Sequence, residues 1–199
     1  MFCLAGALAS ALNADTIVYY NISTSSGGAD GVDFVGPLYN SFTSGAGSRI
    51  TSLKLILSGD HTSSGIVDVG LYADNSTEPG ELMAVLGRVN DSTLSSAPVV
   101  FDIMLTAYPL VTNRTSYWIG LSGTTSAEWS YDDDMSGIGV EGESFSNQTG
   151  VYSDDYGPYQ MQVTEGGPSI PEPPSGLLIA LGAGLLALGW PRAAAGKHR

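Results

Sequence analysis

The chain has 199 residues, a formal net charge of −13 and a single cysteine. This length corresponds to one domain with a core large enough to fold without cross-links, and one cysteine allows no internal disulfide. A uniformly acidic surface repels the phosphate backbone, so we expect no nucleic-acid partner.

The first segment, residues 1–14 (MFCLAGALASALNA), has the apolar stretch and small residues of a secretory signal peptide. Its basic start is missing, because the first basic residue of the chain is Arg49. Cleavage after Ala11 and cleavage after Ala14 both fit the small-residue rule. We favour Ala14, because strand-like sequence begins directly after it, and expect the exported domain to cover residues 15–164.

This domain is predicted to be all-β, because short alternating segments are separated by Gly, Ser, Asn and Asp, with no sustained helical period. The loop over residues 74–80 is expected to extend through Pro79 and Gly80, which disfavour a strand ladder. So many strands in one domain predict a two-sheet antiparallel sandwich of jelly-roll type. The predicted strands cover residues 16–20, 38–43, 50–58, 65–73, 82–89, 99–105, 116–122, 127–131 and 159–164.

Alternation also predicts which face each side chain occupies. In residues 50–58, Leu53, Leu55 and Leu57 share a face and are expected in the core. In residues 116–122, Trp118 falls on the face opposite to Ile119 and Leu121.

The end of the chain has three consecutive parts. Residues 165–175 form a Pro-rich linker, residues 176–190 are apolar, and Arg192, Lys197 and Arg199 make a basic tail. As a helix the apolar run covers about 22 Å, against about 30 Å for the hydrocarbon core of a bilayer. We therefore expect residues 176–199 to form a single, marginally inserted transmembrane helix with a cytoplasmic tail, and the preceding domain to be exported.

These three parts resemble the PEP-CTERM sorting signal of exported bacterial proteins. The matching motif is Pro171, Glu172 and Pro173, followed by the apolar run and the basic tail. Two features depart from that pattern: Pro174 precedes Ser175, and the basic residues are spread out instead of clustered. The resemblance implies recognition by an exosortase, a membrane protease-transpeptidase that removes or exchanges the helix.

The body of the chain resembles the choice-of-anchor R proteins, which carry such signals. The resemblance covers most of residues 36–166 and implies an extracellular β domain, but it supplies no active site. It lies in the segments GPLYNSFTSG, ITSLKLILS, VDVGLYAD, EPGELMAVLG, TSYWIGLSG, AEWSY and PYQMQVTEG.

Catalytic motifs are not evident in the sequence, and we expect a protein that is not an enzyme. The two histidines, His61 in a turn-like loop and His198 in the tail, lie outside any nucleophile or metalloprotease motif. A hydrolase would need two carboxylates that converge on one point, and sequence spacing does not give the distance between them in space. The acids available for such a pair are Glu128, Asp132, Asp133, Asp134, Glu141 and Glu143.

Two binding hypotheses remain open beside this. Asp132, Asp133 and Asp134 carry hard oxygen ligands suited to calcium, although their spacing matches no EF-hand. Trp118, Trp129 and Tyr131 are candidates for sugar contact, or alternatively for the core.

The sequence therefore predicts an exported, non-enzymatic cell-envelope protein with a structural or adhesive role, in company with exopolysaccharide. It carries no cofactor unless calcium binds. The alternative is a calcium-assisted carbohydrate-binding module, which requires an exposed tryptophan.

Overall fold

The computed structural model describes residues 14–22, 26–60, 64–154 and 157–167. In this part of the chain it shows two antiparallel sheets and one short 3-10 helix, η1 (Asp91–Thr93), which confirms the all-β prediction. Sheet A contains, in spatial order, β1 (Thr16–Tyr20), β12 (Met161–Gly166), β4 (Arg49–Ser58), β9 (Glu128–Tyr131) and β2 (Gly28–Gly31), with β7 (Val99–Asp102) also paired to β4. Sheet B contains β11 (Gly150–Ser153), β10 (Ser144–Asn147), β3 (Leu38–Thr43), β8 (Ser116–Gly123), β5 (Ile66–Asp74) and β6 (Pro79–Asn90).

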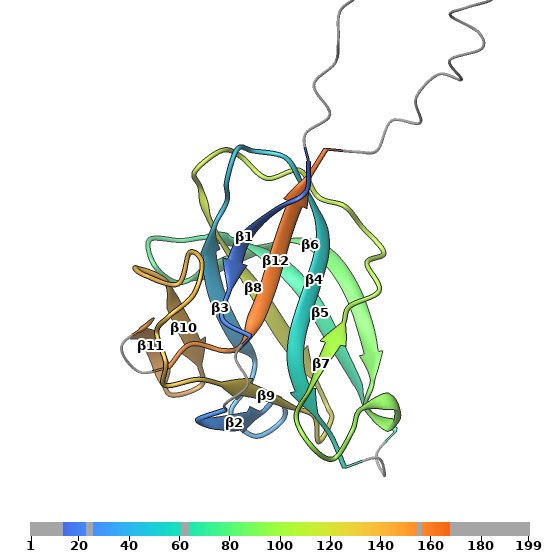
Figure 1. Cartoon of the computed structure of the whole chain (residues 1–199). Coiled ribbons are helices and arrows are strands. Elements are labelled where there is room, and N and C mark those ends of the chain that lie inside the picture. The colour runs from blue at the N-terminus through green and yellow to red at the C-terminus, as the bar shows by residue number, and fades with distance from the viewer. Residues whose placement is uncertain (1–13, 23–25, 61–63, 155–156, 168–199) are drawn as a thin grey trace, which may run out of the picture. The chain divides into compact units, whose positions relative to one another are not determined.

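The two sheets pack face to face around one hydrophobic core (Figure 1). Both sheets supply alternate residues to it, as the period of two predicted. Burying an aliphatic side chain of this kind stabilises the folded state by about 1.5–3 kcal/mol relative to leaving it exposed. From sheet A come Leu53, Leu55, Leu57, Met161 and Val163, and from sheet B come Leu38, Val67, Val69, Leu71, Ile119 and Leu121.

The segment that follows β7 joins the two sheets along one side. The Ile103 N–H donates to the Leu53 carbonyl of β4 at 3.0 Å, and the Thr106 N–H donates to the Leu86 carbonyl of β6 at 2.7 Å. β6 is an edge strand, so this segment caps part of an otherwise unpaired edge. The strand predicted over residues 99–105 therefore ends at Asp102, because the chain turns away to bridge the sheets.

Two further boundaries differ from the prediction. Pro79 and Gly80, expected in a loop, begin β6, and Pro79 pairs with Asp74 of β5. A proline is compatible with the first position of an edge strand, where no ladder N–H is needed. At the other end of the domain, Glu165 and Gly166, expected in the linker, belong to β12 and pair with β4.

Three short strands, β2, β10 and β11, were not predicted, because their residues read as Gly- and Ser-rich loops. β2 (GADG) has no apolar alternation, and it forms because its backbone pairs with β9. β10 and β11 form a hairpin with Gln148 and Thr149 as its loop, and Asn147 Oδ1 accepts the Thr149 N–H at 2.9 Å. Phe145 and Tyr152 stack across this hairpin, with ring centroids 5.1 Å apart.

The first and last strands of the domain are neighbours. β1 runs antiparallel to β12, with Thr16 opposite Glu165, so both described ends leave sheet A at the same place (Figure 1). Except for Ala14, the expected signal peptide lies outside the described residues, as do the sorting motif and the C-terminal helix with its tail. Within the described ranges, no helix has the length and hydropathy needed to cross a membrane.

Candidate binding face on sheet B

Trp118 of β8 lies on the outer side of sheet B, opposite to the core residues of its strand, as predicted. Its side chain is nevertheless only 1% exposed. The indole Nε1–H donates to Asp74 Oδ1 at 2.8 Å, which satisfies the one polar atom of the ring. Trp118 therefore offers no flat face to a ligand.

Trp129 of β9 points into the core and is 0% exposed. Its ring stacks on Tyr159, with centroids 4.7 Å apart, and its Nε1–H donates to the Gln160 carbonyl at 2.9 Å. Tyr131, two residues further, is half-buried against the same core. The structure thus places both tryptophans in structural positions, and they do not meet the exposed-tryptophan requirement of the carbohydrate-binding alternative.

The acidic stretch after β9 does not converge on one point. Asp132 is buried and its Oδ1 accepts the Asp134 N–H at 3.0 Å, whereas Asp133 and Asp134 are exposed. A hydrogen bond from the Ser136 backbone N–H lowers the pKa of Asp134. Among the described residues, no group of three His, Cys, Asp or Glu side chains is placed to hold a metal ion. The structure therefore does not bring these three carboxylates together as metal ligands.

Glu143 is also buried, and it belongs to a hydroxyl network on the outer side of β3. Its Oε2 accepts the Ser41 hydroxyl at 2.9 Å and its Oε1 accepts the Thr43 hydroxyl at 2.6 Å. Burial raises the pKa of Glu143 above the ordinary value of 4.5, and the nearby Asp154 carboxylate adds to this, while the two hydroxyls oppose it.

A raised pKa makes stability depend on pH with a definite sign. Because folded Glu143 holds its proton at a pH where the unfolded chain has lost it, its contribution to stability is fully present below pH 4.5 and falls as the pH rises through the folded pKa. We expect Glu143→Gln to become more stable, relative to wild type, as the pH rises from 4.5. Urea unfolding of both proteins across this range measures the difference, and a difference that stays constant or reverses would contradict the expectation.

The centre of this outer face carries two adjacent glycines, Gly70 of β5 and Gly120 of β8, which pair across the strands. A Cβ at Gly120 would lie 2.5 Å from the Tyr72 ring and 2.6 Å from the Tyr39 ring, and one at Gly70 would lie 2.8 Å from Tyr72. The two tyrosines meet edge to face, with centroids 5.1 Å apart. The absent side chains thus let the Tyr72 ring lie down on the sheet.

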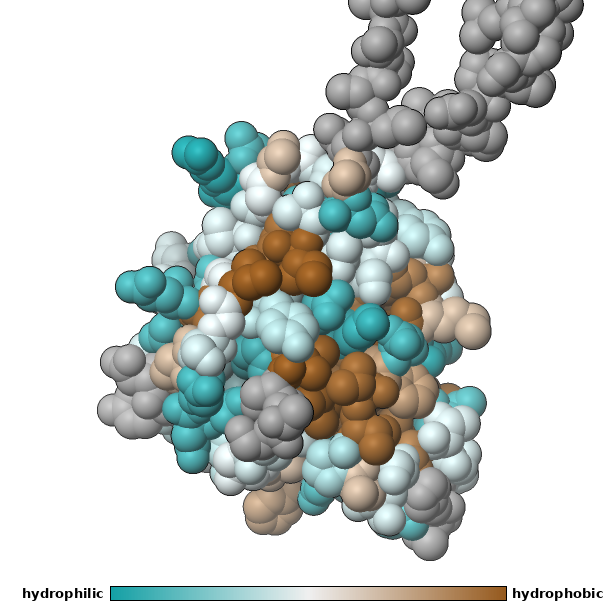
Figure 2. All heavy atoms as spheres, in the orientation of Figure 1, coloured by the Kyte–Doolittle hydropathy of each residue, from teal (hydrophilic) through white to brown (hydrophobic). Residues whose placement is uncertain are grey.

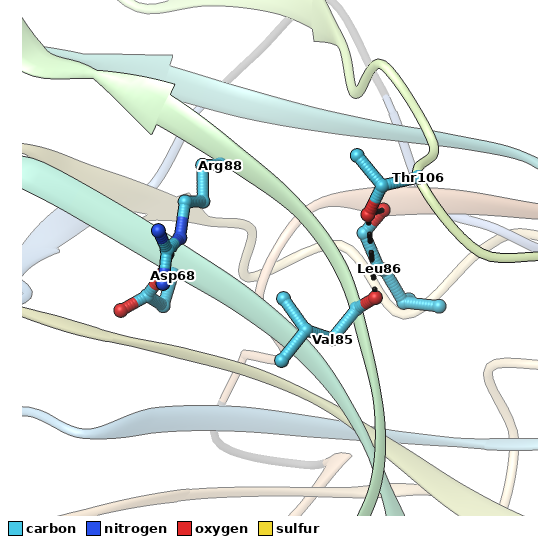
Figure 3. Close-up of polar contacts among 5 residues, drawn as sticks. All are labelled: Asp68, Val85, Leu86, Arg88 and Thr106. Carbon is cyan, nitrogen blue, oxygen red and sulfur yellow. Dashed lines mark hydrogen bonds and ion pairs between the residues drawn. The ribbon is translucent and has the colours of Figure 1, made fainter.

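A pocket of about 150 Å³ opens beside this ring, between β5 and β6. Arg88 Nε donates to Asp68 Oδ1 at 2.6 Å within it. Figure 3 shows these two side chains meeting on one side of β6, while Thr106 contacts the backbone of Val85 and Leu86 on the other. The pocket is lined by Asp68, Val69, Gly70, Tyr72, Leu82, Val85, Arg88 and Ser122.

This pocket combines an aromatic ring, an ion pair, a hydroxyl and apolar side chains on paired strands. Leu82 and Val85 are 45% and 43% exposed, although both lie in a regular strand. The sequence-based prediction missed this site because it placed sugar contact at Trp118, Trp129 and Tyr131 and did not consider Tyr72. A usable signal was present, since the outward positions of β5 and β8 both place a glycine between polar or aromatic residues.

Exposed apolar side chains also occur on sheet A. Val99 and Val100 of β7 are exposed, and Figure 2 shows a hydrophobic area on this face, over the region of β4 and β7. The same two strands carry an ion pair between Lys54 of β4 and Asp102 of β7, at 3.6 Å.

The fold and the pocket define an all-β protein of two antiparallel sheets with a small polar and aromatic pocket on the outer side of one of them. No family model matches the sequence, and comparison with curated proteins and with solved structures returns no match.

Proposed function

We propose that this chain is an exported bacterial protein that a C-terminal sorting signal delivers to the cell envelope, where its β domain has a structural or adhesive role without catalysis. The observation that carries the proposal is the order of three parts at the end of the sequence: Pro171-Glu172-Pro173, the apolar run of residues 176–190, and the basic residues Arg192, Lys197 and Arg199. The chain is then a single-pass membrane protein before processing, with an exosortase as its partner. After processing it belongs to the cell surface or the exopolysaccharide matrix.

The structure of the domain is compatible with such an attachment. β12 ends at Gly166, and only residues 167–170 separate it from Pro171. From the sequence we expect the prolines of this linker to favour an extended chain, which would make the motif accessible to a protease. We further propose a jelly-roll connectivity, because the chain changes sheet at most of its connections, among them β3 to β4, β4 to β5 and β6 to β7.

The sorting proposal is tested by the intact mass of the protein recovered from envelope and medium of a bacterium that has an exosortase. We expect a species cut near Pro173 or Ser175, and we expect it to disappear in the double variant Pro171→Ala/Glu172→Ala. The matched control is Pro168→Ala, a proline of the same linker outside the motif. Persistence of the full C-terminus in the membrane would contradict sorting and would indicate a simple tail anchor.

A further inference from the structure

We propose that the pocket between β5 and β6 binds one hexose ring of a neutral polysaccharide. This proposal deepens the adhesive role above and rests on it for its biological setting. The binding itself depends only on the described residues Asp68, Tyr72, Arg88 and Ser122, together with the apolar side chains beside them.

The first argument concerns the ring that would receive the sugar. Tyr72 is half-buried and is fixed from two sides, by the sheet at Gly70 and Gly120 and by the edge of Tyr39. One face of a pyranose presents C–H groups, which pack on an aromatic ring and on aliphatic side chains such as Leu82. Since the ring is already ordered before binding, little side-chain entropy is lost when a sugar docks.

The second argument concerns hydrogen bonding. The ion pair uses Asp68 Oδ1 and Arg88 Nε. The second carboxylate oxygen and the two terminal guanidinium nitrogens therefore provide an acceptor and donors a few ångströms apart. Each sugar hydroxyl both donates and accepts, so two neighbouring hydroxyls match this pair, and bonds to charged groups are the stronger ones. Both residues lie on paired β-strands, which hold their spacing.

The third argument selects a neutral ligand. The chain carries a net charge of −13, and the one guanidinium of the pocket is already paired with a carboxylate. An anionic sugar, such as a uronate, would meet general repulsion with no unpaired cation in the pocket to offset it. A neutral hexose meets no such penalty.

The fourth argument concerns size. About 150 Å³ corresponds to the share of about five water molecules in the liquid and is roughly half the lower bound for pockets that enclose drug-sized molecules. The pocket thus suits one ring of a chain whose other rings remain in solvent. Binding per site is then weak, with a dissociation constant on the order of 1 mM. Many copies on one surface would hold the same polymer far more tightly.

Affinity electrophoresis tests the proposal with the full-length chain, kept soluble in a detergent without a sugar headgroup. Native gels contain dextran, galactomannan or alginate. We expect retardation that grows with the concentration of the two neutral polymers and that free glucose, galactose or mannose reverses. Alginate should give none.

Two variants assign the binding to the pocket. Arg88→Ala should weaken the retardation by at least about tenfold. The matched control is Lys54→Ala, which breaks the ion pair with Asp102 on sheet A, the other ion pair among the described residues. This variant should leave the retardation unchanged. Circular dichroism confirms that both variants fold. Equal retardation of wild type and Arg88→Ala, equal retardation by alginate, or none by either neutral polymer would overturn the proposal. The assay contains no exosortase, so its result on sugar binding is independent of the result on C-terminal processing.

Discussion

Replacing Trp129 with alanine is expected to lower the free energy of unfolding by about 3–5 kcal/mol. The indole is fully buried, stacks on Tyr159 and donates to the Gln160 carbonyl. Alanine therefore leaves a cavity and removes one of the two hydrogen bonds that this carbonyl accepts, the other coming from the Ile56 N–H at 3.2 Å. Urea unfolding followed by circular dichroism measures this loss without relying on the fluorescence of the removed residue.

The conservative variant Trp129→Phe separates the two contributions. Phenylalanine keeps an aromatic ring on Tyr159 but has no N–H, so we expect a loss of about 0.5–1.5 kcal/mol from the missing hydrogen bond. The Gln160 carbonyl still accepts the Ile56 N–H. A Trp129→Ala protein as stable as Trp129→Phe would show that the ring does not support the core.

Asp91→Ala is also expected to have a large effect and to lower the free energy of unfolding by about 3 kcal/mol. Asp91 is fully buried in η1, and its Oδ2 accepts the Thr125 hydroxyl at 2.7 Å and both the N–H and the hydroxyl of Ser126, at 3.0 and 2.8 Å. Alanine would remove the acceptor of these three hydrogen bonds, of which the one from Thr125 is buried and the two from Ser126 are half-buried, and would loosen the turn that leads into β9. Thermal and urea unfolding both report the change.

The matched control for this variant is Asp102→Ala, which removes the exposed carboxylate 3.6 Å from Lys54. A surface pair of this kind contributes about 0–1 kcal/mol, so its loss should be small. Equal losses from the two aspartate variants would contradict the role assigned to the buried carboxylate.

The larger strands were predictable because their residues alternate with a period of two, as in β4 and β5. That signal is absent where a strand forms only through its partner. β2 contains two glycines and an aspartate, and it is ordered by pairing with β9. Pro79 was predicted to lie in a loop because proline has no N–H to donate to a strand ladder. It is compatible with β6 because it is the first residue of an edge strand, where that N–H is not needed.

The candidate site was less predictable than the fold, because pairing register decides it. Alternation placed Trp118 on the outer face, but it gave no information on whether neighbouring strands cover that face. The pocket depends on Gly70 lying opposite Gly120 and on Asp68 lying opposite Arg88. These pairings join residues far apart in the sequence, and no local pattern reports them.

The position of β12 between β1 and β4 has a mechanical consequence for a domain held by its C-terminus. A pull transmitted through Gly166 runs along β12, whereas its hydrogen bonds to both neighbours lie across the strand. Such a force shears many bonds at once instead of opening them one after another. Sliding β12 out of the sheet would also pull Met161 and Val163 out of the core, and the loss of their burial opposes the force. A polymer held on sheet B while the cell moves away would therefore load the domain in its stiffest direction.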